Sequence, residues 1–296
     1  MTAPPAGATA PDGLGMSWDP DAARLPGVGP STVVLITGGT GAIGLRLAEV
    51  FVQLGAQVAI TSRSADRAAR EAARLGADGR APASGEALGI RADVADPGDA
   101  RSAVSQVTSR WGRLDVLVQC AALGDHSTFD QLDVATLDAL LATNVKGVLL
   151  VAQAAAEPMR AQGRGRIVNV ASIMAHRGGS HHAAYGASKA AVVYTSRSLS
   201  AELGPHGITV NSVSPGSTPT VLREPGDAPG SAAQPARDSG AGKIPLRRRG
   251  HLDDYVGPIL FLASDLARYV TGADILIDGG LAIVRPLPGR EREKCQ

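Results

Sequence analysis

Three side chains with acid–base and hydrogen-bonding chemistry lie close together in the sequence: Ser172, Tyr185 and Lys189. Tyr185 and Lys189 are four residues apart in an alanine-rich, proline-free segment that predicts a helix, so they share one face of it. A free phenol has a pKa near ~10, and a neighbouring ammonium group lowers that pKa toward neutral pH. Ser172 follows a short β-branched run at residues 166–170, and its hydroxyl can hold the same substrate oxygen. Proton transfer at a carbon–oxygen bond is the chemistry that needs this trio.

A tyrosine four residues before a lysine occurs by chance in many helices, so the elements around the trio decide what it means. Residues 32–37 read TVVLIT, a continuous apolar strand of the kind that is buried on both faces of a parallel sheet. The strand runs into GGTGAIG at residues 38–44 and then into an amphipathic helix. Gly39, Gly41 and Gly44 satisfy G-x-G-x-x-G, which brings the backbone close to a pyrophosphate at a helix N-terminus. A tight turn with a purely structural role is the alternative.

The end of the second predicted strand, residues 57–61, bears on which dinucleotide would bind. An enzyme that prefers NAD carries an Asp or Glu about twenty residues after the glycines, where it accepts from the ribose hydroxyls. Here the chain reads Thr61-Ser62-Arg63-Ser64, so no acid repels a phosphate, and Arg63 can pair with one. The sequence therefore predicts NADP(H) over NAD(H). Otherwise Arg63 is a solvated surface charge.

The rest of the chain alternates strands and helices at the spacing of a doubly wound parallel sheet in an α/β, Rossmann-like single domain. Ligands of such folds gather beyond the carboxyl ends of the strands, and Asp93, Ala121 and Pro215 fall at such ends. Asn144 stands in the middle of a long apolar helix, which indicates either exposure or a hydrogen bond with a purpose. The further predicted strands are 87–92, 114–120, 208–214 and 274–277, and the further helices are 65–75, 97–111, 134–159 and 251–263.

Composition bounds the domain organisation and the partners. With 296 residues the chain suits one α/β domain of about 250 residues plus tails. We expect a flexible extension at 1–31, the domain at 32–284 and a polar tail at 285–296; within the domain, the Pro- and Gly-rich stretch 217–250 suits a lid over the substrate. A net charge of +1 and an aromatic content of 3% argue against nucleic acid or an acidic membrane surface as partner.

The sequence also predicts a soluble, cytoplasmic protein without a metal site. No run approaches the roughly 18 apolar residues of a membrane span, and the N-terminus lacks the basic and apolar regions of a signal peptide. The two cysteines, Cys120 in a predicted strand and Cys295 in the tail, make a disulfide framework improbable, which suits a reducing cytosol.

Together these motifs resemble the short-chain dehydrogenase/reductase family in its short single-domain branch, over about residues 32–280. They are TGGTGAIG, ADV, LDVLV, ATNVKG, Ser172 thirteen residues before YGASK, ITVNSVSPG and FLASDLARYVTGADILIDGG. The resemblance implies an NAD(P)-dependent oxidoreductase that moves a hydride between the nicotinamide and a ketone or secondary alcohol. In it Tyr185 is the general acid/base, Lys189 lowers the tyrosine pKa and holds the nicotinamide ribose, Ser172 polarises the carbonyl, and Asn144 supports a water linking Lys189 to solvent.

Met174, His176, His181 and His182 lie between Ser172 and Tyr185. This position makes them candidates for the substrate pocket, Met174 and His182 above all; otherwise they are ordinary loop residues. The resemblance also implies contacts of the cofactor and a homo-oligomer, tetramer or dimer, through the helices that carry Asn144 and Tyr185. The residues expected at the cofactor are Gly38, Thr40, Gly41, Ile43, Gly44, Ser62, Arg63, Asp93, Val94, Ala121, Ala122, Asn144, Tyr185, Lys189, Pro215, Gly216, Thr218 and Thr220.

Two departures from the family pattern keep other functions open. Ala42 stands where the branch usually has glycine, and QCAA at 119–122 replaces the usual Asn-Asn-Ala-Gly. The asparagine that is lost normally braces the central sheet, and Ala122 narrows the approach to the adenosine ribose, so the geometry of the cofactor site is in question. The alternatives are non-redox chemistry on the same fold, such as isomerisation, dehydration or cyclisation, and a nucleotide-sensing protein without turnover.

Overall fold

The computed structural model describes residues 25–77, 85–218 and 241–283. Within them, seven strands form one sheet in the order β3-β2-β1-β4-β5-β6-β7, and every neighbouring pair is parallel. This confirms the predicted α/β, Rossmann-like single domain. The strands are β1 (Val33–Thr37), β2 (Gln57–Ser62), β3 (Glu86–Arg91), β4 (Val116–Gln119), β5 (Gly165–Val170), β6 (Ile208–Pro215) and β7 (Asp274–Ile277).

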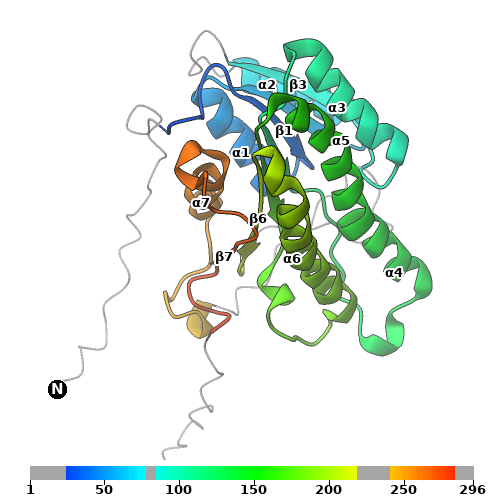
Figure 1. Cartoon of the computed structure of the whole chain (residues 1–296). Coiled ribbons are helices and arrows are strands. Elements are labelled where there is room, and N and C mark those ends of the chain that lie inside the picture. Colours follow the sequence, from blue (N-terminus) through cyan, green and yellow to red (C-terminus); the bar gives the residue numbers. More distant parts are fainter. Residues whose placement is uncertain (1–24, 78–84, 219–240, 284–296) are drawn as a thin grey trace, which may run out of the picture.

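Helices cover both faces of the sheet (Figure 1). The side chains of β1 explain how: Val34 and Ile36 pack in one core layer with α1 and α7, while Val33 and Leu35 pack in the other with α3 and α5. Because a strand alternates its side chains between two faces, a strand between two helical layers must be apolar throughout. The helices are α1 (Ala42–Gln53), α2 (Ala65–Ala77), α3 (Pro97–Trp111), α4 (Val134–Leu141), α5 (Gly147–Gln162), α6 (Ala183–Leu203) and α7 (Asp253–Ala263).

The order of the strands reverses between β1 and β4. From β1 the chain builds outward through β2 and β3, then crosses back to β4 and continues through β5, β6 and β7. At such a switch point the connections diverge to opposite faces and leave a crevice at the carboxyl ends of the strands. The glycine turn after β1 and the QCAA stretch after β4 therefore meet at one edge.

The long helix predicted for 134–159 is interrupted in its middle. It consists of α4, a π-helical turn at Ala142–Lys146, and α5. A π turn inserts one extra residue into the helix, and such insertions occur mostly at functional sites. Asn144 lies within this turn, which the pattern of apolar residues did not reveal.

The last described residues of the predicted N-terminal extension contact the domain. Leu25 and Val28 pack against the apolar core, and the backbone N–H of Asp265 donates to the carbonyl of Pro26. Gly27 has φ +84°, and a methyl group there would lie 2.6 Å from the Asp265 carboxyl carbon, so the chain turns closely around this residue. Residues 25–31 thus belong to the domain, whereas residues 1–24, 219–240 of the expected lid, and the tail from 284 lie outside the described residues.

Candidate active site

The glycine turn leaves no room for side chains. A methyl group at Gly38, where φ is +61°, would lie 2.7 Å from the Cα of Ala121, and one at Gly44 would lie 2.7 Å from the carbonyl oxygen of Gly38. Arg67 of α2 donates to the carbonyl of Thr40 at 2.7 Å and holds the turn from outside. The start of α1 is therefore a close-fitting backbone cradle, which suits a pyrophosphate at a helix N-terminus.

A cleft of about 750 Å³ opens beyond the carboxyl ends of the strands, within the size range of small-molecule sites. The turn after β1, the ends of β2 and β3, the QCAA stretch, Ser172, Tyr185, Lys189 and the end of β6 all line it. Asn144 lies behind the lining, and Thr220 lies outside the described residues. The expected cofactor residues in the lining are Gly38, Thr40, Gly41, Ile43, Gly44, Ser62, Arg63, Asp93, Val94, Ala121, Ala122, Tyr185, Lys189, Pro215, Gly216 and Thr218.

Several residues of the lining escaped the sequence analysis. Arg67 and Arg70 join Arg63 at the end of the cleft beyond β2, while Leu123 and Thr143 line it beyond β4. Arg67 and Arg70 lie on the predicted α2 after the end of β2, so their helical spacing was the available signal. Leu123 and Thr143 have uncharged side chains that do not stand out in the sequence. Only the fold brings them to the cleft.

Ser172, Tyr185 and Lys189 converge at the wall formed by β5 and α6. All three side chains are nearly buried, with exposed fractions of 8%, 8% and 3%. Lys189 Nζ donates to the carbonyl of Val170 at 2.8 Å and lies 5.9 Å from the centre of the Tyr185 ring, and Ser172 is near enough to Tyr185 to lower its pKa. The predicted spacing on the helix thus brings the three groups to one point.

The pKa of the tyrosine shifts in the direction opposite to the prediction. Burial raises the pKa of Tyr185 to about 12, with the hydrogen bond from Ser172 acting the other way. Burial also lowers the pKa of Lys189 to about 8, opposed by its interaction with Cys120. Desolvation disfavours both charged forms, and the ammonium of Lys189 donates to the carbonyl of Val170. In this structure burial therefore sets the direction of the shift in the tyrosine pKa.

Asn144 acts on the cleft through its neighbours. Its side chain is fully buried, and its amide accepts from Leu123 N at 2.8 Å and donates to Leu123 O at 2.9 Å. The same amide group donates to the hydroxyl of Ser188, the residue before Lys189, at 3.0 Å. Asn144 thus fixes the loop after β4 to the helix that carries the tyrosine and the lysine.

Gln119 restores the bracing that the QCAA stretch was expected to lose. Its buried amide donates to the carbonyl of Val148 on α5 at 3.0 Å and to the side chain of Asn169 on β5 at 3.1 Å. Asn169 donates in turn to Ser196 of α6 at 2.9 Å. The longer glutamine side chain therefore connects the sheet to both helices.

Cys120, which follows β4, is a free thiol, and burial raises its pKa to about 12.

The loop between Ser172 and Tyr185 is held at its middle. His176 lies 2.8 Å from the buried carboxylate of Asp274 on β7, which also accepts from the hydroxyls of Ser212 and Ser214 on β6. His182 lies beside Tyr185, with ring centres 6.4 Å apart. Met174 is half-buried against Gly179 and Gly186. Neither Met174 nor His182 lines the 750 Å³ cleft, so their predicted contact with substrate remains a hypothesis.

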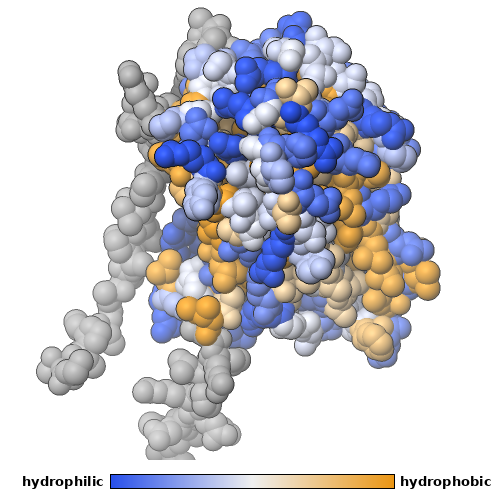
Figure 2. Space-filling view, viewed as in Figure 1, coloured by the Kyte–Doolittle hydropathy of each residue, from blue (hydrophilic) through white to orange (hydrophobic). Residues whose placement is uncertain are grey.

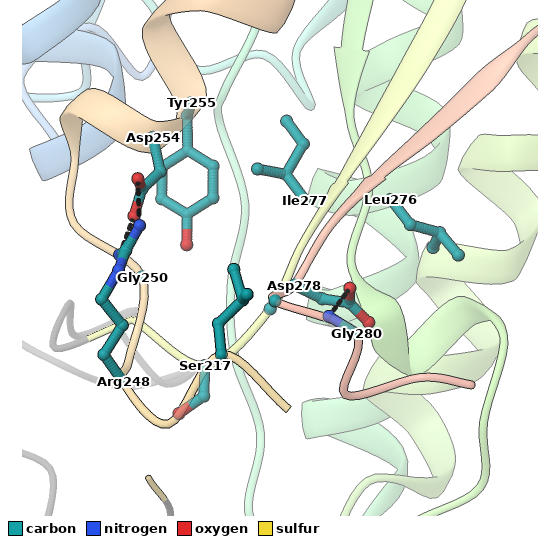
Figure 3. Close-up of a pocket in the computed structure, with 12 residues that line it drawn as sticks. Ser217, Arg248, Gly250, Asp254, Tyr255, Leu276, Ile277, Asp278 and Gly280 are labelled. Atoms are coloured by element: carbon teal, nitrogen blue, oxygen red, sulfur yellow. Dashed lines mark hydrogen bonds and ion pairs between the residues drawn. The ribbon is translucent and has the colours of Figure 1, made fainter. Parts of the chain in front are cut away.

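Figure 3 shows residues that line a second cavity of about 490 Å³. This cavity shares Gly216 of its lining with the cleft. Its polar groups already have partners in the protein: Arg248 forms an ion pair with Asp254 at the rim, and Asp278 accepts from the N–H of Gly280 at 2.8 Å. Tyr255, on its wall, is hydrogen-bonded through its hydroxyl to Thr218. The hydrogen bond between Tyr255 and Thr218 holds the chain at Thr218 in place. We assign no ligand to this cavity. Among the described residues no cluster of three His, Cys, Asp or Glu could hold a metal ion.

Fold and site together define an α/β protein in which a glycine turn, a tyrosine and a lysine line one cleft. Residues 39–282 match the family model described as "Enoyl-(Acyl carrier protein) reductase". The chain is 36% identical to a D-threitol dehydrogenase of Mycolicibacterium smegmatis over 85% of this chain and 93% of that one. It is 38% identical to a cyclohexanol dehydrogenase of Rhodococcus sp., over 84% of this chain and 95% of that one.

A solved structure of a short-chain type dehydrogenase/reductase from Mycobacterium marinum is similar in fold. It superposes with a TM-score of 0.76 at 37% identity, covering 86% of this chain and 96% of that one. The chain belongs to the short-chain dehydrogenase/reductase family, a family of oxidoreductases that use NAD(P).

Proposed function

We propose that the protein is an NADP(H)-dependent alcohol dehydrogenase or carbonyl reductase that acts on a small secondary alcohol or the matching ketone. The observation that carries the proposal is the convergence of Ser172, Tyr185 and Lys189 on the wall of the cleft that the glycine turn begins. Relatives named for the oxidation of a polyol and of a cyclic alcohol support an alcohol as substrate. A cytoplasmic location stays a prediction.

The residues of the site divide the proton chemistry between them. NADP(H), when bound, supplies the hydride acceptor or donor. In reduction, the protonated Tyr185 donates its hydroxyl proton to the carbonyl oxygen while the hydride reaches the carbonyl carbon, so that the ketone becomes an alcohol; in oxidation, the phenolate form of Tyr185 takes the hydroxyl proton while the adjacent carbon loses its hydrogen as hydride. Ser172 donates to the same substrate oxygen, and Lys189 reaches the cleft from one helical turn further along α6. Asn144 acts as a positioning residue.

Three arginines support the preference for NADP(H). Arg63, Arg67 and Arg70 line the cleft beyond β2, where the ribose of the adenosine half would lie, and among the described residues the one acid in the lining, Asp93, follows β3 instead. Guanidinium groups match the geometry of a phosphate better than any other side chain. Of the three, only Arg67 also holds the glycine turn, so Arg63 is the arginine whose loss tests phosphate recognition most cleanly.

Replacing Arg63 with alanine should weaken NADPH binding about tenfold and leave NADH binding within about twofold. One charge-assisted hydrogen bond to phosphate contributes about 1.5 kcal/mol, and 1.4 kcal/mol corresponds to a factor of ten. Fluorescence titration of the reduced nicotinamide measures both constants, and turnover of secondary alcohols with NADP⁺ or NAD⁺ tests the function itself.

Arg74→Ala, on the outer end of α2, is the matched control because Arg74 pairs with Glu49 and Glu71 rather than lining the cleft. Equal loss of NADPH and NADH affinity in Arg63→Ala would contradict phosphate recognition. Reduction of an enoyl thioester in the absence of any alcohol or ketone turnover would overturn the proposed substrate class.

An apolar surface supports the proposed homo-oligomer. Large side chains are exposed along α4, α5 and α6, among them Val134 at 73%, Leu149 at 43% and Tyr194 at 69%. Figure 2 shows hydrophobic residues gathered over α4 and α5, at the right of the view. The run Val134–Gln162 is long and apolar enough to cross a membrane by length and composition alone. An interface between subunits explains the apolar side chains on this surface, because contiguous exposed apolar patches mark interaction sites.

We expect light scattering to give the mass of a dimer or tetramer, and Leu149→Asp to shift it toward the monomer. A carboxylate buried without a partner in an apolar interface is costly enough to oppose association. Arg101→Glu on α3, which is exposed away from this face, is the control and should leave the mass unchanged. A monomeric wild-type protein would contradict the proposal.

A further inference from the structure

Two histidines from separate elements meet beside Tyr185. His182 precedes α6, and His126 follows β4; their rings pack edge to face with centres 5.1 Å apart and planes at 82°. The His182 ring also lies 6.4 Å from the Tyr185 ring, at 62°. Both distances fall within the range of aromatic pairs. From the tyrosine outward, the order is therefore Tyr185, His182, His126.

The residues on both sides of His126 are held in place. Asn144 holds both backbone groups of Leu123, and Leu123 and Asp125 are only 5% and 4% exposed. The Asp125 carboxylate accepts from the backbone N–H and the hydroxyl of Ser127, which fixes the turn on the other side of the histidine. His126 itself is exposed. A fixed backbone thus presents the exposed His126 ring beside His182.

The hydrogen bonds of the two rings define what they offer a ligand. Nδ1 of His182 lies 2.6 Å from the carbonyl of Ser180, and a carbonyl only accepts, so we assign the proton to Nδ1. In the neutral ring Nε2 is then an acceptor. Within the described part of the chain, neither this Nε2 nor the nitrogens of His126 have a partner, so all are available to hydroxyl groups.

We propose that His126 and His182 form a hydroxyl-recognition pair that selects polyols over alcohols with a single hydroxyl group. This inference rests on the proposed function: Tyr185 takes the proton of the hydroxyl that is oxidised, and the imidazoles bind a neighbouring hydroxyl of the same substrate. A site built to hydrogen-bond a hydroxyl discriminates strongly against analogues that lack it, because its polar groups then lose their partners. An alcohol with one hydroxyl group gains nothing from the pair.

The test compares D-threitol with cyclohexanol as substrates of the full-length enzyme and its variants. We expect His182→Ala and His126→Ala each to lower kcat/KM for D-threitol about tenfold, chiefly through KM, and to change kcat/KM for cyclohexanol less than about threefold. His182→Asn, which keeps a hydrogen-bonding side chain, should recover part of the loss. His206→Asn is the control, because this exposed histidine follows the end of α6 that is opposite to Tyr185.

The outcomes separate this inference from the proposed function. Parallel losses on both alcohols, or no loss on either, would overturn hydroxyl recognition while leaving alcohol oxidation intact. A wild-type enzyme that oxidises cyclohexanol but not D-threitol would do the same. A wild-type enzyme that binds NADPH but oxidises no alcohol would instead remove the proposed function and this inference with it.

Discussion

Tyr185→Phe lowers the rate of alcohol oxidation by a factor of about 10² to 10⁴ and leaves the affinity for NADPH within about twofold. General acid–base catalysis contributes rate factors of this size. The substitution removes one hydroxyl and keeps the ring, whose side chain is 8% exposed and packs at the start of α6. Steady-state turnover measures the first quantity, and fluorescence titration of NADPH measures the second.

The same helix supplies a matched control for this prediction. Tyr194 also lies on α6 but is 69% exposed, so Tyr194→Phe removes an identical hydroxyl away from the cleft and should leave turnover unchanged. Unchanged turnover in Tyr185→Phe would contradict the mechanism. Loss of turnover together with loss of NADPH binding would point to a collapsed site, which a thermal unfolding midpoint would reveal.

The sequence predicted the fold well because the local signals and the global fold agree. Pro97 and Trp111 bound α3 as predicted, since Asp96 caps the helix and Gly112 follows it in the left-handed conformation. The apolar run of β1 predicted burial on both faces. Most of the cleft lining was predicted for a related reason: in a parallel sheet every strand ends at the same edge, so residues that follow strands meet in space.

Predictions failed where the cause is a contact between distant residues. The partners of Asn144 are Leu123 and Ser188, and no periodicity reveals that it lies in a π turn. Gln119 was interpreted as the loss of a brace, yet its extra methylene lets the amide reach Val148 and Asn169. Asp265 similarly draws the supposedly flexible residues next to Pro26 onto the domain. Each case depends on a contact between residues that are far apart in the sequence.

The tyrosine pKa illustrates a limit of a different kind. The spacing of Tyr185 and Lys189 was sufficient to predict their proximity, and Coulomb attraction alone would have lowered the phenol pKa. Burial disfavours the charged forms of both groups, and the local sequence does not show how large this effect is. Because burial also lowers the pKa of Lys189 to about 8, the charge of the lysine itself depends on pH within the working range of the enzyme.

The dependence of the Lys189 charge on pH leads to a prediction for the pH profile of activity. For carbonyl reduction by the wild type, kcat/KM for NADPH should be constant near neutral pH and fall as pH rises through about 8, where Lys189 loses its proton. A profile of kcat/KM reports the groups of the free enzyme, which is the state that the structure describes. Lys189→Met should reduce turnover about 100-fold and abolish this fall. Lys189→Arg keeps a charge at all these pH values, so any activity it retains should not break near pH 8.

Stability provides an independent check on the same titration. The pKa of Lys189 is lower in the folded protein than the ordinary 10.5, so between about pH 8 and 10.5 the unfolded chain binds more protons than the folded one. This group therefore makes the free energy of unfolding rise with pH across that window, while below pH 8 the folded protein bears the full cost of a buried charge. Denaturant unfolding of the wild type and Lys189→Met should show a difference between them that changes in this window and is constant below it. A difference that is independent of pH would mean that Lys189 is charged throughout, and the fall in activity would then need another cause.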